Sequence, residues 1–167
     1  MKTLKRRRRA NKTDYAKRIR LLKSRTPRVV FRKTNRYLIA QYVSSNEAQD
    51  SVSVNLNSKI LSKYGWPKEA SSSIKSMPAA YFIGAVMGSA INEKKLKTPI
   101  IDFGMHMVTD KGKLFAFIKG LIDSGVKIEC DSKNFPSKER LSGEHLTKKI
   151  PFEKIKSSII KKQNDKN

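Results

Sequence analysis

The chain has 167 residues, with 37 Lys and Arg against 14 Asp and Glu, and a formal net charge of +23. That length allows one domain with extensions around a real hydrophobic core, and so large a cationic excess is typical of proteins that bind nucleic acid or anionic surfaces. The single cysteine, Cys130, excludes an internal disulfide and fits a reducing compartment. The longest apolar stretch, residues 77–91, is shorter than the roughly 20 residues of a membrane span, so we expect a cytoplasmic protein.

The positive charge is concentrated at the two ends of the chain. Residues 1–36 hold 16 Lys and Arg against one acid, and residues 147–167 hold seven Lys against two acids. Residues 37–146 are nearly balanced, with 14 Lys and Arg against 11 acids. We therefore expect a basic arm and helix at 1–27, a globular domain at 28–146 and a basic C-terminal helix within 147–167.

A short basic helix is predicted to begin after residue 12, where Thr13 or Asn11 can act as the N-cap. Tyr15, Ile19 and Leu22 recur at helical spacing and predict a narrow apolar seam. Most of the remaining helix surface is Lys and Arg. An isolated solvated tail would not need such a seam, so the segment is expected to fold.

A three-stranded antiparallel meander is predicted next, because the apolar period changes to two. The expected strands are 28–33, 37–43 and 51–56. In the first strand, Val29 and Phe31 point to one face, which leaves Arg28 and Arg32 together on the other face.

A long helix is predicted over 77–95, with Ser76 as its N-cap. Its Ala80, Gly84 and Gly88 form a ridge of small residues. Such a ridge allows a close approach of another element, and we expect that element to be the sheet.

Three more elements complete the expected domain: a buried strand over 98–104, an amphipathic helix over 112–125 and a last strand over 126–130. The resulting order predicts an α/β fold with a mixed sheet, in which a meander is followed by two βαβ-type crossovers. Near the C-terminus, Ile155 and Ile159 lie at a helical spacing that predicts a packed or docked helix.

No catalytic or cofactor-binding pattern is evident. Asp102, Phe103 and Gly104 match the magnesium-binding tripeptide of protein kinases, but no glycine-rich loop or catalytic loop accompanies them. A buried strand that ends in a glycine turn explains them better. His106 and His145 lie too far from each other and from the one cysteine to form a zinc pattern. We expect neither metal nor cofactor.

The basic N-terminal region indicates RNA binding. Arginine offers a planar fork that matches phosphate and a flat surface that stacks on bases, and Asn35 can read a base edge or a 2′-hydroxyl. Folded RNA fits such a mixture of arm, helix and hairpin better than duplex DNA, since no helix-turn-helix or zinc finger is evident. The run Arg6–Arg9 alone equally fits a nuclear-import signal. Trp66 either stacks on a base or anchors the core.

Five stretches are familiar as a set: "TDYAKRIRLLKSRTPRVVFRKTNRYLIAQ", "KYGW", "PAAYFIGAVMG", "DFGMH" and "FPSKERLSGEHL". With these stretches in this order, the chain resembles the archaeal and eukaryotic type of universal large-subunit ribosomal protein eighteen over about residues 5–147. The resemblance implies a ribonuclease H-like fold without an active site. It also implies a monomeric component of the large ribosomal subunit that binds 5S rRNA, contacts large-subunit rRNA and neighbouring ribosomal proteins, and seats the 5S rRNA in the central protuberance.

The charge pattern and the resemblance together give one set of RNA-binding candidates. They are Arg6, Arg7, Arg8, Arg9, Lys12, Tyr15, Lys17, Arg18, Arg20, Lys23, Arg28, Arg32, Lys33, Asn35, Arg36, Trp66 and His106. Arg140 and His145 either contact RNA as well or tie the C-terminal turns together.

Two other functions compete with this hypothesis. An enzyme of ribonuclease H type needs a cluster of metal-binding carboxylates, and the acids of the middle region show no such spacing. A non-specific binder of nucleic acid or anionic membrane needs only the charge, and it predicts similar affinity for any polyanion of equal length.

Overall fold

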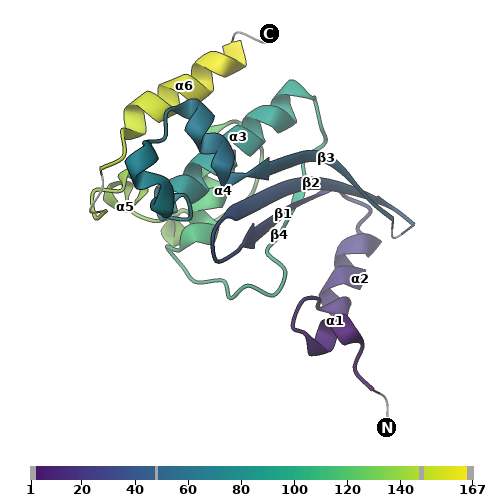
Figure 1. Cartoon of the computed structure of the whole chain (residues 1–167). Helices are drawn as coiled ribbons and strands as arrows, with labels where there is room; N and C mark the ends of the chain where they lie inside the picture. The colour runs from purple at the N-terminus through teal and green to yellow at the C-terminus, as the bar shows by residue number, and fades with distance from the viewer. Residues whose placement is uncertain (1–2, 48, 147–148, 165–167) are drawn as a thin grey trace.

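The computed structural model describes residues 3–47, 49–146 and 149–164, and these form a mixed sheet packed against helices (Figure 1). The four strands are β1 (Arg28–Lys33), β2 (Leu38–Asn46), β3 (Gln49–Asn57) and β4 (Ile100–Asp102). They lie in the order β3-β2-β1-β4. The meander β1-β2-β3 is antiparallel, while β4 pairs with β1 in parallel. The predicted meander and α/β class are confirmed.

Helices α3 (Met77–Glu93) and α4 (Lys113–Asp123) share one hydrophobic core with the sheet. The alternation in β1 explains how: Val29 and Phe31 are fully buried, and the Phe31 ring stacks on that of Phe117 from α4 at 4.3 Å. Ser76 occupies the N-cap position of α3 as predicted, although its hydroxyl makes no capping hydrogen bond.

The ridge of small residues on α3 packs against α4, so the prediction that it faces the sheet is wrong. A Cβ atom added at Gly84 would collide with the backbone carbonyl of Phe117, and one added at Gly120 would collide with that of Tyr81. The two helices therefore cross at backbone contact, which only glycine permits at these positions.

Residues 126–130 do not form the predicted last strand. Val126 is buried, and Ile128 and Cys130 pack partly against the core, but no strand is present over this segment. Its alternating apolar residues are thus buried without ladder hydrogen bonds. Of the two expected crossovers, the described residues contain one, from β3 through α3 to β4.

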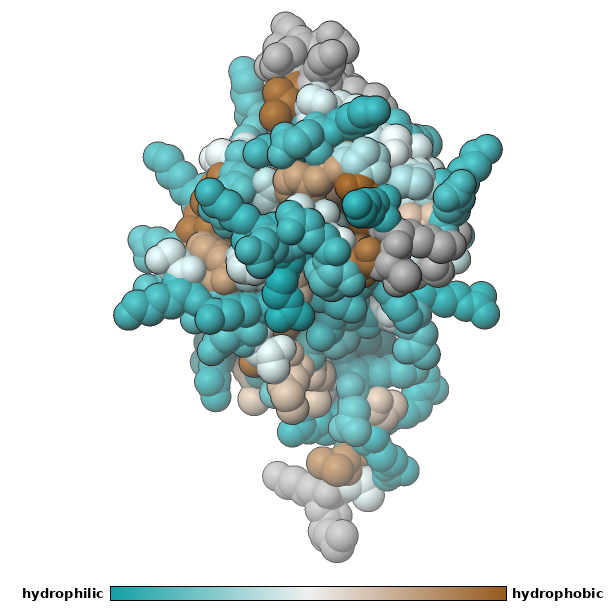
Figure 2. All heavy atoms as spheres, turned by 90° about the vertical axis from the view of Figure 1, so that its left-hand side faces the viewer, coloured by the Kyte–Doolittle hydropathy of each residue, from teal (hydrophilic) through white to brown (hydrophobic). Residues whose placement is uncertain are grey.

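The other α-helices are α1 (Arg6–Arg9), α2 (Tyr15–Lys23), α5 (Lys138–Ser142) and α6 (Phe152–Asn164), and 3-10 helices lie at Ser58–Tyr64, Lys68–Ser73 and Ser132–Asn134. Helices α1 and α2 lie beyond one end of the sheet, whereas α6 lies across the molecule from them (Figure 1). None of the described helices combines the length and apolarity that a membrane span requires. On the face that Figure 2 shows, long hydrophilic side chains project into solvent, and apolar residues form small patches between them.

Candidate nucleic-acid interface

Helix α2 is the central element of the basic N-terminal region. Its N-cap is Asp14, whose carboxylate accepts hydrogen bonds from the backbone N–H groups of Ala16 and Lys17. The prediction of Thr13 or Asn11 as the cap is therefore wrong; the Thr13 hydroxyl instead accepts a hydrogen bond from Arg7 Nε at 2.9 Å. An anionic cap suits a helix N-terminus because it meets the positive end of the helix dipole.

The apolar seam of α2 is only partly covered. Ile19 is 54% exposed, Tyr15 and Leu22 are half-buried, and α2 has no buried residue. The Tyr15 ring lies under the Lys5 ammonium, with 4.6 Å between the nitrogen and the ring centroid. The seam therefore contributes little burial, and polar contacts attach the helix to the sheet.

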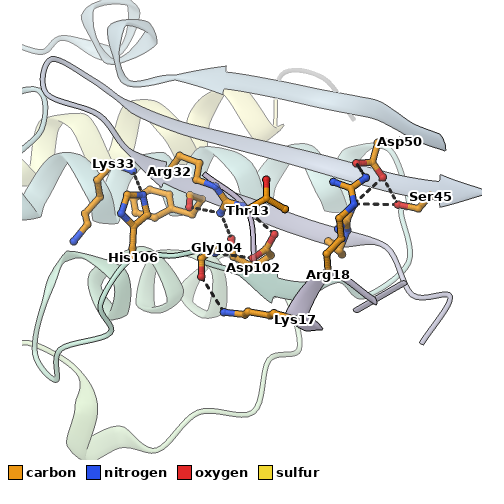
Figure 3. Close-up of polar contacts among 12 residues, drawn as sticks. Thr13, Lys17, Arg18, Arg32, Lys33, Ser45, Asp50, Asp102, Gly104 and His106 are labelled. Atoms are coloured by element: carbon orange, nitrogen blue, oxygen red, sulfur yellow. Dashed lines mark hydrogen bonds and ion pairs between the residues drawn. The ribbon is translucent and has the colours of Figure 1, made fainter. Parts of the chain in front are cut away.

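Two such contacts join α2 to separate parts of the domain (Figure 3). Lys17 Nζ donates to the carbonyl oxygen of Gly104, at 3.2 Å, in the turn after β4. Arg18 Nη2 donates to Asp50 Oδ2, at 3.0 Å, near the start of β3. Helix α2 is thereby fixed at two points.

The Asp50 carboxylate is shared by several donors. It accepts hydrogen bonds from Arg28 Nη2 at 2.8 Å and from the Ser45 hydroxyl at 2.6 Å, in addition to Arg18. Partial burial alone would raise the pKa of Asp50, but the Ser45 hydrogen bond and the charges of Arg28 and Arg18 outweigh it. The pKa therefore lies below its ordinary value, and Asp50 is a fixed negative charge at neutral pH.

Arg28 differs from the exposed cation that the strand pattern predicts. Its side chain is only 4% exposed, and its guanidinium is engaged with Asp50 and Ser45. The Arg28 Nε lacks a hydrogen-bond partner among the described residues. Arg28 thus supports the interface from beneath, and the shared open face with Arg32 is not formed.

Arg32 organises the turn that follows β4. It donates to the Asp102 carboxylate at 3.0 Å and to the Asp102 carbonyl oxygen at 2.7 Å, while Asp102 Oδ1 accepts from the Gly104 N–H at 2.7 Å. Burial would raise the pKa of Asp102, but Arg32, the Gly104 N–H and Lys17 lower it overall. Gly104 has a φ of +61°, so the interpretation of Asp102–Gly104 as a strand that ends in a glycine turn is confirmed.

His106 belongs to the same turn and acts as an acceptor. Its Nε2 accepts a hydrogen bond from the backbone N–H of Lys33 at 3.0 Å (Figure 3). Burial, and then the charges of Lys33 and Arg32, lower the pKa of His106. The imidazole is therefore neutral at pH 7 and holds the turn against the end of β1. Within the described part of the chain, no group of three or more His, Cys, Asp or Glu residues is placed to hold a metal ion.

Between α2 and the sheet these side chains surround a cavity of about 130 Å³. Six cations line it, together with two acids: Arg7, Lys12, Lys17, Arg18, Arg28 and Arg32, with Asp14 and Asp102. The excess of positive charge gives the cavity an affinity for anionic groups.

The other candidates fall into two groups. Arg6, Arg7, Arg8, Arg9, Lys12, Arg20, Lys23, Asn35 and Arg36 are exposed, and Lys33 is half-buried. Trp66, in contrast, is 5% exposed and its indole N–H donates to the Ala70 carbonyl oxygen at 3.0 Å, so it anchors the core and has no free face for a base. Arg140 and His145 are exposed.

Sequence reasoning missed the acidic residues of the candidate interface. Asp50 and Asp102 hold arginines that lie 22 and 70 residues away from them in the chain. No local pattern signals such pairs, because strand pairing brings the partners together. It also missed Lys75, which donates to the Asn35 carbonyl oxygen at 2.9 Å and adds a cation beside the β1–β2 turn.

Comparisons with known proteins agree on one family. A family model described as "Ribosomal large subunit proteins 60S L5, and 50S L18" matches residues 1–99. The large ribosomal subunit protein uL18 of Korarchaeum cryptofilum is 40% identical over 141 residues, which cover 84% of this chain and 70% of the relative.

Two further relatives carry the same name. That of Caldivirga maquilingensis is 39% identical over 142 residues, or 84% of this chain and 67% of the relative. That of Methanoregula boonei is 36% identical over 141 residues, or 84% of this chain and 79% of the relative. These matches favour a ribosomal protein over the enzymatic alternative, because the relatives are proteins of the large ribosomal subunit. The chain therefore belongs to the uL18 family and is a structural component of the large subunit of cytoplasmic ribosomes.

Proposed function

We propose that this protein binds 5S rRNA and attaches it to the large-subunit rRNA in the central protuberance. The observation that carries the proposal is the cationic surface of α1 and α2 around the basic cavity. The β1–β2 turn adds the exposed side chains of Asn35 and Arg36. Most of its cations are exposed, whereas Arg28 and Arg32 are engaged with carboxylates. The exposed cations contact phosphate, and the paired arginines hold the elements that carry them.

The three parts of the chain have different tasks in this proposal. Residues 1–27 supply most of the phosphate contacts, and residues 28–146 form the scaffold that fixes their position. The basic C-terminal part, 147–167, contacts a ribosomal neighbour with its outer face; residues 147–148 and 165–167 lie outside the described residues.

The test is equilibrium binding to 5S rRNA near physiological salt, with an unrelated folded RNA and a DNA duplex of equal length as competitors. We expect a preference for 5S rRNA of about a hundredfold or more, which corresponds to about 2.7 kcal/mol. Equal competition by all three nucleic acids would instead support the non-specific alternative.

The salt dependence gives a second readout of the same experiment. If about six to eight phosphates are contacted, log affinity should fall with log salt at a slope of about 0.7 to 0.9 per contact. A slope near zero would contradict an interface built on these cations.

A further inference from the structure

We infer that Asp50 is a positioning residue of the RNA interface: this acid holds helix α2 in its binding orientation, and so strengthens the binding of a polyanion. The inference rests on the proposed function. It assigns to a negative charge, inside a strongly cationic region, a favourable effect on affinity for RNA.

The first step is the weak apolar attachment of α2. The helix has no buried residue, and its seam residue Ile19 is mostly exposed. Hydrophobic packing therefore does not fix the direction in which Lys17, Arg20 and Lys23 point. The side-chain contacts of α2 with β3 and with the turn after β4, Arg18 to Asp50 and Lys17 to Gly104, must do so.

The second step is that Asp50 is itself immobilised. It lies opposite Ser45 in the β2–β3 register and accepts the Ser45 hydroxyl. The same Asp50 oxygen also accepts a hydrogen bond from the buried guanidinium of Arg28 on β1. One carboxylate thus joins β1, β2, β3 and α2, as the right-hand cluster of Figure 3 shows for Ser45, Asp50 and Arg18.

The third step concerns the cost of binding. A surface whose cations are already oriented loses less conformational freedom when it meets a rigid RNA, so preorganisation raises affinity and selectivity. Without Asp50, α2 would sample several orientations before binding. Long-range attraction would persist, but the fit to one folded RNA would be lost.

The binding experiment compares Asp50→Asn with Glu47→Gln. Both variants remove one negative charge near the β2–β3 turn, and Glu47 is exposed. Simple electrostatics predicts that both tighten RNA binding. We expect Asp50→Asn to bind 5S rRNA about tenfold more weakly, a loss of about 1.4 kcal/mol, and Glu47→Gln to bind as well as or better than the parent. Equal or tighter binding by Asp50→Asn would overturn the inference.

A second measurement uses the free protein and needs no RNA. NMR order parameters of the amides of residues 15–23 should fall from about 0.85 toward 0.6 in Asp50→Asn. Arg18→Gln should have the same effect while leaving the Arg28–Asp50 pair in place, so it serves if Asp50→Asn does not fold. Arg20→Gln removes the same charge from the same helix and should leave α2 ordered. Unchanged order in Arg18→Gln contradicts the inference.

The two proposals fail separately. Absence of a 5S preference in the parent protein would refute the proposed function. The NMR order parameters of α2 would still test whether Asp50 holds that helix in one orientation. Fluorescence of Trp66, which is buried in the core, checks that each variant retains its fold.

Discussion

The two basic helices at the ends of the chain are attached to the domain in different ways. Both have apolar residues at helical spacing on a cationic surface. Helix α6 buries Ile155 completely and leaves Ile159 5% exposed, whereas α2 buries none of its residues. The Phe152 ring of α6 also packs on those of Tyr81 and Phe82, with centroids 5.4 and 4.8 Å apart.

The difference comes from the surface that each helix meets. Helix α6 covers α3, whose Tyr81 and Phe82 present a broad apolar surface. Helix α2 lies beyond the end of the sheet, where it forms hydrogen bonds with Asp50 and with the carbonyl oxygen of Gly104. An apolar seam thus indicates that a helix can pack on the domain. Whether it does so depends on whether the surface of the domain that faces the seam is also apolar. This polar attachment engages Lys17 and Arg18 and leaves Arg20 and Lys23 exposed for an anionic partner.

The largest expected effect tests this contrast in stability. Ile155→Ala should lower the free energy of unfolding by about 2–5 kcal/mol, because it leaves a cavity in the core. Ile19→Ala in α2 should change it by less than about 0.5 kcal/mol, since that side chain is largely exposed. Urea unfolding monitored by Trp66 fluorescence measures both. Similar losses in the two variants would mean that α2 is packed as tightly as α6.

An intermediate effect concerns RNA binding. The double variant Arg6→Gln, Arg9→Gln and the double variant Lys154→Gln, Lys156→Gln each remove two exposed cations, one pair from each end of the chain. We expect the first to reduce the salt slope of 5S binding by about 1.4 to 1.8, because two phosphate contacts are lost. The second should leave the slope unchanged. Equal reductions would indicate that the protein binds as an undifferentiated polycation.

Local patterns in the sequence predict much of this fold, and the failures share one cause. The alternation in 28–33 predicts β1 correctly, because Val29 and Phe31 are buried in the hydrophobic core on one face of the strand. The same alternation in 126–130 predicts a strand that does not form, since whether a neighbour is free to pair is not encoded locally. Similarly, the concentration of cations in residues 1–36 can be read from the sequence, but the burial of Arg28 under Asp50 depends on the register of β1, β2 and β3.

The smallest expected effect comes from pH, since the two ends of the molecule also differ in what can titrate. Phe152, Ile155 and Ile159 of α6 contact the core through apolar side chains, whereas the turn beside α2 contains His106, whose pKa is lowered by burial and by Lys33 and Arg32. Its unfolded pKa is about 6.5. Between that value and the lower folded pKa, the unfolded chain binds more protons than the folded chain. The contribution of neutral His106 to stability is therefore complete above about pH 6.5 and is lost as the pH falls toward the folded pKa.

Thermal unfolding at pH 7.5 and pH 5.5 measures this contribution. The parent protein should lose stability between the two pH values, and His106→Gln should lose less, because glutamine can still accept the Lys33 N–H but does not titrate. An Ile155→Ala background should keep the whole pH dependence, since α6 has no part in it. If His106→Gln leaves the pH dependence as it is in the parent, another group is responsible, and the turn beside α2 is not the pH-sensitive end of the molecule.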